Sequence, residues 1–104
     1  MSRIALVRTT FGDRARAEQV ARALIDERLV ACATLEQVHS IYRWQGTVEQ
    51  ADEAAVLFKA RPEDAYDLLA RITELHDYDV PVIEYWTVDA NPPAKDWVNE
   101  ATAR

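Results

Sequence analysis

The sequence predicts an α+β domain in which two strand–helix–strand halves are joined by a long β-hairpin and followed by a short C-terminal helix. Two segments carry apolar residues at helical spacing, and extended runs rich in β-branched and aromatic residues lie between and after them. A glycine separates the two longest of these runs, as in a hairpin turn. The chain of 104 residues can bury one hydrophobic core, so residues 1–104 are expected to form one domain.

The N-terminal segment predicts the first strand and the first helix. Ile4–Val7 is a short apolar run typical of a buried strand, and the polar residues 8–13 are expected to form a loop. Asp13 or Thr10 can cap the helix that follows, and the helical pattern ends near Leu29. The apolar face of this helix is predicted to contain Ala17, Val20, Ala21, Leu24 and Ile25.

The middle of the chain predicts a hairpin and a second helix. Residues 31–44 and 47–59 are expected to form the two arms, because Gly46 between them supplies the positive φ that a tight turn requires. Pro62 fits the first turn of the second helix, which is expected to end near His76. The apolar face of the second helix is predicted to contain Ala65, Leu68, Leu69, Ile72 and Leu75.

The C-terminal segment predicts one more strand and a short helix. Residues 80–88 form the strand candidate, with Pro81 near its start, where a missing N–H matters least. Asn91 is expected to cap the last helix and Pro92 to begin it. One side of that helix is predicted to hold Trp97, Val98 and Ala101. The order βαββαβ predicts a ferredoxin-like sandwich with both larger helices on one face of an antiparallel sheet.

The hairpin arms are long for a chain of this size. An arm of about 14 residues extends about 45 Å at about 3.3 Å per residue, whereas a domain of about 100 residues has a radius of gyration of about 13 Å. The arms are therefore expected to project beyond their own core. Exposed strands that carry Ile41, Tyr42, Trp44 and Val48 require a partner, and self-association into a closed ring satisfies this requirement.

Composition excludes several classes of partner. The formal net charge is −6 and basic residues are scattered, which disfavours a nucleic-acid partner. Cys32 is the only cysteine, so a disulfide within the chain and a cysteine-based zinc cage are excluded, and we interpret Cys32 as a small buried hydrophobe. The N-terminus lacks the long apolar stretch of a secretory signal. A cytoplasmic protein with no membrane partner is expected.

The order and spacing of several short motifs resemble the CutA family of divalent-cation tolerance proteins. These motifs are residues 23–35, residues 40–49, Lys59, the loop at residues 76–81 and Asp96-Trp97. The resemblance implies a ferredoxin-like homotrimer with a fold similar to the PII signalling proteins, in which the long hairpins meet neighbouring subunits. It also implies a link to copper and other divalent metals, with no enzymatic reaction and no required cofactor.

The sequence departs from the family pattern at the positions associated with copper. Some members have a cysteine where Arg8 stands and a histidine pair where Leu75 and His76 stand, and only His76 of that set is present. Asp77 and Val82 stand where a proline and a glutamate are usual in the family. A copper site of that design is therefore incomplete in this chain.

The resemblance also implies a ligand-binding cleft near the subunit interface, formed by residue types found here at Tyr42, Trp44, Glu49 and Lys59. An aromatic wall with one carboxylate and one ammonium group suits a small polar ligand. The alternative is that the two aromatic residues pack at a subunit interface and that Glu49 and Lys59 form an ion pair.

The loop after the second helix contains the metal-site candidates. His76, Asp77 and Asp79 together offer an imidazole and two carboxylates, which suit a borderline divalent metal such as Cu(II) or Zn(II). The alternative is that a partly positive His76 interacts with the helix C-terminus, where the helix dipole favours cations, while the aspartates are solvated.

Three hypotheses about function remain. The first is a homotrimeric binding protein that takes a divalent metal or a small ligand and contributes to metal tolerance. The second is an adaptor or signalling trimer that acts through protein partners, as a PII-like fold allows. The third is an enzyme that uses Tyr42, Glu49, Lys59 and His76. This hypothesis ranks last because the carboxylates are scattered along the sequence and no catalytic constellation is recognisable.

Overall fold

A computed structural model describes residues 2–104. The elements in chain order are β1 (Ser2–Phe11), α1 (Arg14–Asp26), β2 (Cys32–Trp44), β3 (Thr47–Ala60), the 3₁₀ turn η1 (Pro62–Asp64), α2 (Ala65–Leu75), β4 (Ile83–Ala90) and α3 (Pro92–Ala101). The strands form one antiparallel sheet in the order β2-β3-β1-β4. The predicted ferredoxin-like βαββαβ arrangement, with its long hairpin and final helix, is confirmed.

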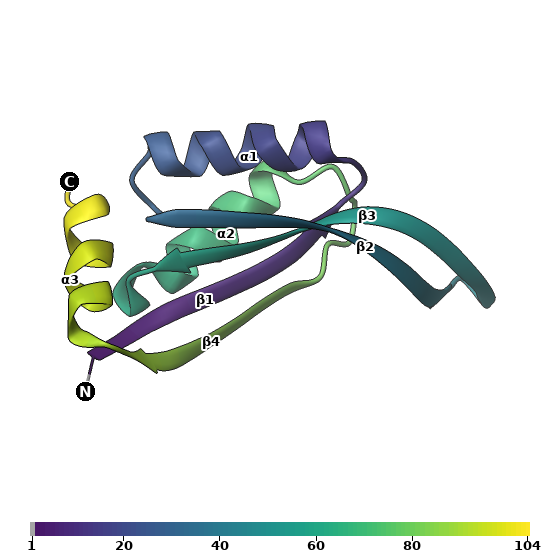
Figure 1. The fold of residues 1–104 in the computed structure, drawn as a ribbon. Helices are drawn as coiled ribbons and strands as arrows, with labels where there is room; N and C mark the ends of the chain where they lie inside the picture. Colours follow the sequence, from purple (N-terminus) through teal and green to yellow (C-terminus); the bar gives the residue numbers. More distant parts are fainter. Residues whose placement is uncertain (1) are drawn as a thin grey trace.

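The core lies between one face of the sheet and the helices α1 and α2. Alternate residues of β1 and β3 are buried in it, including Val7, Phe11 and Phe58, each fully inaccessible to solvent. Leu24 of α1 and Leu68 of α2 meet these strands in the same cluster. The helical patterns in the sequence therefore identify the core faces of α1 and α2, except at Ile25, which is 43% exposed. In Figure 1 the start of β1 and the C-terminus lie beside α3, at the end of the sheet opposite the hairpin tip.

The first strand is longer than the sequence pattern predicted. It runs to Phe11, so the loop expected at residues 8–13 is wrong except for its last two positions. Thr9 and Phe11 are buried on the helix side, whereas Arg8 and Thr10 point to the other face of the sheet. The apolar run ends at Val7 because the side chains of β1 beyond that residue face the core on one side of the sheet and carry polar groups on the other side.

The starts of α1 and α3 agree with the predicted N-cap positions, whereas the end of α1 does not agree with the predicted boundary. The Asp13 carboxylate accepts a hydrogen bond from the Arg16 amide at 2.8 Å, as an N-cap should. The chain leaves α1 early, at Asp26, because Arg28 adopts a left-handed conformation with φ of 59°. Asn91 occupies the N-cap position of α3 and Pro92 begins the helix, as predicted, but the Asn91 side chain makes no capping hydrogen bond.

The hairpin of β2 and β3 projects beyond the core, as predicted. Its arms pair without interruption from Cys32 opposite Lys59 to Trp44 opposite Thr47. Gln45 and Gly46 both have positive φ, 49° and 82°, which is the conformation of a type I′ turn. The molecule measures 45 × 25 × 22 Å, and Figure 1 shows the hairpin tip extending past the ends of α1 and α2.

The last strand starts later than predicted, at Ile83 rather than residue 80. Residues 76–82 instead form an irregular connection from the end of α2 to β4, which we call the α2–β4 loop. Because β4 pairs with β1, this loop is placed against the end of β1. The candidate site lies there.

Candidate functional site

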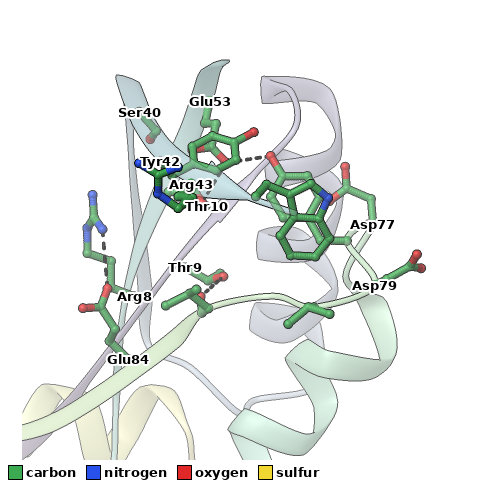
Figure 2. Close-up of a pocket in the computed structure, with 14 residues that line it drawn as sticks. Arg8, Thr9, Thr10, Ser40, Tyr42, Arg43, Glu53, Asp77, Asp79 and Glu84 are labelled. Carbon is green, nitrogen blue, oxygen red and sulfur yellow. Dashed lines mark hydrogen bonds and ion pairs between the residues drawn. The ribbon is translucent and has the colours of Figure 1, made fainter. Parts of the chain in front are cut away.

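A cavity of about 660 Å³ lies between the hairpin, the end of β1 and the α2–β4 loop. Strand residues on its wall point away from α1 and α2; they are Arg8, Thr10, Ser40, Tyr42, Glu53 and Glu84. The α2–β4 loop contributes a second group, formed by Asp77, Tyr78, Asp79, Val80 and Val82. Figure 2 shows Ser40, Tyr42 and Glu53 facing this space from the hairpin. The cavity therefore depends on elements that are far apart in the sequence.

Glu53 is the central charged group of the cavity. Its residue is 7% exposed, and its Oε2 accepts hydrogen bonds from the Tyr78 hydroxyl at 2.6 Å and the Thr10 hydroxyl at 3.0 Å. Burial pushes the pKa of Glu53 upward, but hydrogen bonds from Ser40, Tyr78 and Thr10, with the charge of Arg8, outweigh it, so the net pKa is below the usual range. A charged carboxylate is thus held in place between two strands and the loop.

Tyr78 closes one side of the cavity. Burial and the neighbouring Glu53 carboxylate raise the pKa of its phenol well above the usual range. The phenol therefore stays protonated and donates to Glu53. It is a structural donor, because a phenol with so high a pKa is a poor acid or base near neutral pH.

The side chain of His76 is fully buried beneath the loop and does not line the cavity. Its ring stacks on Phe11 with centroids 4.4 Å apart, and its side chain has no exposed surface. The Thr9 hydroxyl donates to the Val82 carbonyl at 2.8 Å, so it accepts from His76 Nε2, 3.1 Å away. His76 Nδ1 accepts from the Tyr78 amide at 3.1 Å. Both ring nitrogens are therefore occupied.

These contacts place His76 in its neutral form. Burial lowers its pKa, although Asp77 acts in the opposite direction. The alternative interpretation of a partly positive imidazole at the end of α2 is therefore not supported, even though His76 occupies the C-cap position. The imidazole instead fixes the path of the α2–β4 loop over the end of β1.

The proposed metal ligands do not come together within the chain. Asp77 Oδ2 accepts from the Gly12 amide at 3.3 Å, and Asp79 lies on the cavity wall. Across residues 2–104, no three side chains of the His, Cys, Asp or Glu type are grouped so that they could hold a metal ion. His76 would have to give up the hydrogen bond from the Tyr78 amide before its Nδ1 could offer a lone pair.

Comparison with known proteins identifies the family. The family model of the CutA1 divalent ion tolerance protein matches residues 5–101. The chain belongs to this family. The divalent-cation tolerance protein CutA of Pyrococcus horikoshii is 40% identical over 100 residues, which cover 95% of this chain and 98% of that protein.

Solved CutA structures have the same fold. The structure of CutA from Synechococcus elongatus matches with a TM-score of 0.94 at 26% identity, over 99% of this chain and 93% of that one. The structure of the protein described as periplasmic divalent cation tolerance protein CutA from Archaeoglobus fulgidus matches with a TM-score of 0.91 at 25% identity, over 95% and 98% of the two chains. As far as the structure describes the chain, none of its helices has the length and apolar character needed to cross a membrane.

The residues of the cleft implied by the resemblance to CutA do not lie together within the chain. Tyr42 and Trp44 line the cavity, and Glu49 pairs with Tyr42 across the hairpin but does not line it. Lys59 lies ten residues further along β3, opposite Cys32, which places it about 33 Å from Glu49 at about 3.3 Å per residue. One CutA chain alone therefore does not assemble these four residues into one site.

The cavity also contains residues that the sequence interpretation missed. Arg8 lies 3.6 Å from Glu84, and neither was assigned to a site. Glu53 was detectable as an acidic residue directly before the apolar run at residues 54–58, where a charge requires local partners. Cys32 also differs from its interpretation as a buried hydrophobe, because it is only partly buried.

Proposed function

We propose that this CutA-family protein is a non-enzymatic homotrimer, with one domain per subunit, that contributes to the response to metal ions. In this proposal it binds a divalent metal such as Cu(II) or Zn(II), or a small ligand, at clefts between subunits. The observation that carries the proposal is the projecting hairpin. Ile41 and Val48 near its tip are 64% and 56% exposed, so the arm carries apolar surface that its own chain does not cover.

The separation of the cleft residues supports an intersubunit site. Tyr42 and Glu49 lie near the hairpin tip, whereas Lys59 lies near the other end of β3. A rigid strand keeps these groups apart within one chain. In a closed ring, the tip of one subunit reaches the sheet of the next, so the four residues converge only between subunits.

Three further properties belong to the same proposal. The protein is cytoplasmic, although the Archaeoglobus relative is described as periplasmic. It has no nucleic-acid partner, in line with its net charge of −6. It requires no cofactor, and any metal would act as a bound ligand rather than as a resident centre.

The test combines light scattering with calorimetry on tag-free protein. A trimer that takes up Cu(II) or Zn(II) saturably supports the proposal, and a monomer contradicts it. The variant His76→Ala separates the metal sites: lost binding would place the metal in the α2–β4 loop, and unchanged binding would place it at the intersubunit cleft. A trimer that binds neither metal nor small ligand would favour an adaptor function instead.

A further inference from the structure

The charges around the cavity are unbalanced. Four carboxylates line it, from Glu53, Asp77, Asp79 and Glu84, against two guanidinium groups, from Arg8 and Arg43, which leaves a net charge of −2. A cavity with this charge repels anions and concentrates cations. The excess negative charge of the cavity lining therefore favours a positively charged ligand.

Both arginines already have partners. Arg8 Nη1 lies 3.6 Å from a carboxylate oxygen of Glu84, as Figure 2 shows, and Arg43 Nη1 donates to the Gly46 carbonyl at 3.2 Å. Glu53 is held by two hydroxyl donors. Asp79 makes no hydrogen bond or ion pair within the part of the chain that the structure describes, so its charge is available to a ligand.

Aromatic faces and apolar side chains surround these charges. Tyr42, Trp44 and Tyr78 line the cavity and are 43%, 47% and 36% exposed, so each ring still offers surface to a ligand. Such rings attract organic cations through their negative faces. Val80 and Val82, 65% and 69% exposed, add a surface that suits an apolar body.

The same cavity is poorly suited to a bare metal ion. A divalent metal needs several ligand atoms that converge at about 2.0–2.6 Å. Residues 2–104 contain no such group of side chains, and Glu53 is committed to Tyr78 and Thr10. An ammonium ion needs no fixed coordination sphere, because aromatic faces and nearby carboxylates stabilise it at longer range.

We propose that this cavity binds a small organic ammonium ion with an apolar body, its charge placed between the aromatic rings and Asp79. The cavity volume of about 660 Å³ is suited to such a molecule. The inference rests on the small-ligand part of the proposed function and names the ligand class. It assigns Tyr42 and Trp44 to ligand contact and adds Tyr78 and Asp79 to them.

Three probes of similar shape and different charge test this inference. The probes are 2-phenylethylammonium, 2-phenylethanol and 3-phenylpropionate, each titrated into the intact oligomer while the indole N–H signal of Trp44 is followed by NMR. The Trp44→Phe variant identifies that signal among the three tryptophans. We expect a saturable shift with the ammonium probe, about tenfold weaker binding of the alcohol, and weaker binding still of the carboxylate.

Matched variants locate the site. Asp79→Asn removes one charge from the cavity wall and should weaken ammonium binding several-fold, and Tyr42→Leu should weaken it further. Asp26→Asn removes the same charge from the exposed end of α1, outside the cavity, and should leave binding unchanged. Light scattering on each variant confirms that the oligomer is intact.

The outcomes separate this inference from the proposed function. Equal binding of the alcohol and the ammonium, tighter binding of the carboxylate, no saturable shift, or an effect of Asp26→Asn equal to that of Asp79→Asn each overturns the inference. A trimer that binds Zn(II) but not the ammonium probe overturns only the inference. Ammonium binding by a protein that does not trimerise supports the inference and contradicts the trimer.

Discussion

The two ends of the molecule differ in how far their side chains are paired or covered by other residues of the chain. At the α3 end, Asp64 is 4% exposed and its carboxylate receives hydrogen bonds from Arg61 at 2.8 Å and Arg104 at 2.9 Å, while Val98 is fully buried. At the hairpin end, apolar side chains such as Ile41 and Val48 remain in solvent. The buried charge at the α3 end is satisfied within the chain, although Trp97 there is 46% exposed, whereas the apolar side chains of the hairpin tip are left uncovered.

The largest expected effect comes from the core that joins the two ends. Phe58→Ala removes a fully buried ring and should lower the free energy of unfolding by about 3–5 kcal/mol. Ile41→Ala, on the exposed hairpin arm, should change subunit folding by less than about 0.5 kcal/mol but should weaken assembly. Urea denaturation and light scattering measure the two quantities. Equal losses of folding stability in Phe58→Ala and Ile41→Ala would contradict this difference between the core and the hairpin arm.

The second prediction concerns the α3 end. Asp64→Asn removes the charge that both arginines contact and should destabilise the protein by about 1.5–3 kcal/mol. Burial raises the pKa of Asp64, but hydrogen bonds from Arg61 and Arg104 outweigh it, so the net pKa is lowered. The stabilisation is present above the ordinary value of 3.8 and is lost as the pH falls through the lower native value.

Urea denaturation at several pH values tests the sign of this effect. The difference between the parent protein and Asp64→Asn should shrink as the solution is acidified below the ordinary aspartate pKa. Asp67→Asn, an exposed carboxylate in the first turn of α2, provides the control and should show a smaller effect. A difference that grows on acidification would contradict the assignment.

The third prediction concerns the cavity. Tyr78→Phe removes only the hydroxyl that donates to Glu53 at 2.6 Å and should cost about 1 kcal/mol. The loss of this donor should also raise the pKa of Glu53, because the hydrogen bond favours its charged form. Carboxyl carbon NMR measures that pKa. Tyr66→Phe, on the 80% exposed Tyr66, should leave both quantities unchanged.

The smallest expected effect is a pH dependence at His76. Burial lowers its native pKa, so the unfolded state takes up the proton more readily below the ordinary value of 6.5. Stability should therefore be full above that value and fall as the pH is lowered through it. His76→Gln should reduce this dependence between pH values on either side of 6.5. An unchanged slope would show that another group titrates.

Patterns within single elements predicted much of the fold. The helical spacing in α1 and α2 and the turn at Gly46 follow from local chemistry, and the structure confirms them. The end of β1 was missed because Arg8 and Thr10 point to the cavity, so their polarity reflects the site rather than a loop.

The candidate site was less accessible to sequence reasoning. Tyr42, Trp44, Asp77 and Asp79 do line the cavity, but Glu53 reaches it through strand pairing with β1 and through a loop contact that no local pattern contains. Lys59 was grouped with Glu49 by resemblance, whereas an extended strand separates the two. The distance between two residues of one strand can be predicted from strand geometry. Which distant segments or subunits come together cannot be predicted from local sequence patterns.

The sheet order also affects the sequence of events during synthesis. β1 is made first, yet its hydrogen-bonded neighbours are β3 and β4, so it has no strand to pair with until residues after Thr47 have been made. The β2–β3 hairpin, by contrast, closes through neighbouring residues and can form quickly. The cavity is completed only when β1 and the α2–β4 loop have both docked, so ligand binding reports on the last step of folding rather than the first.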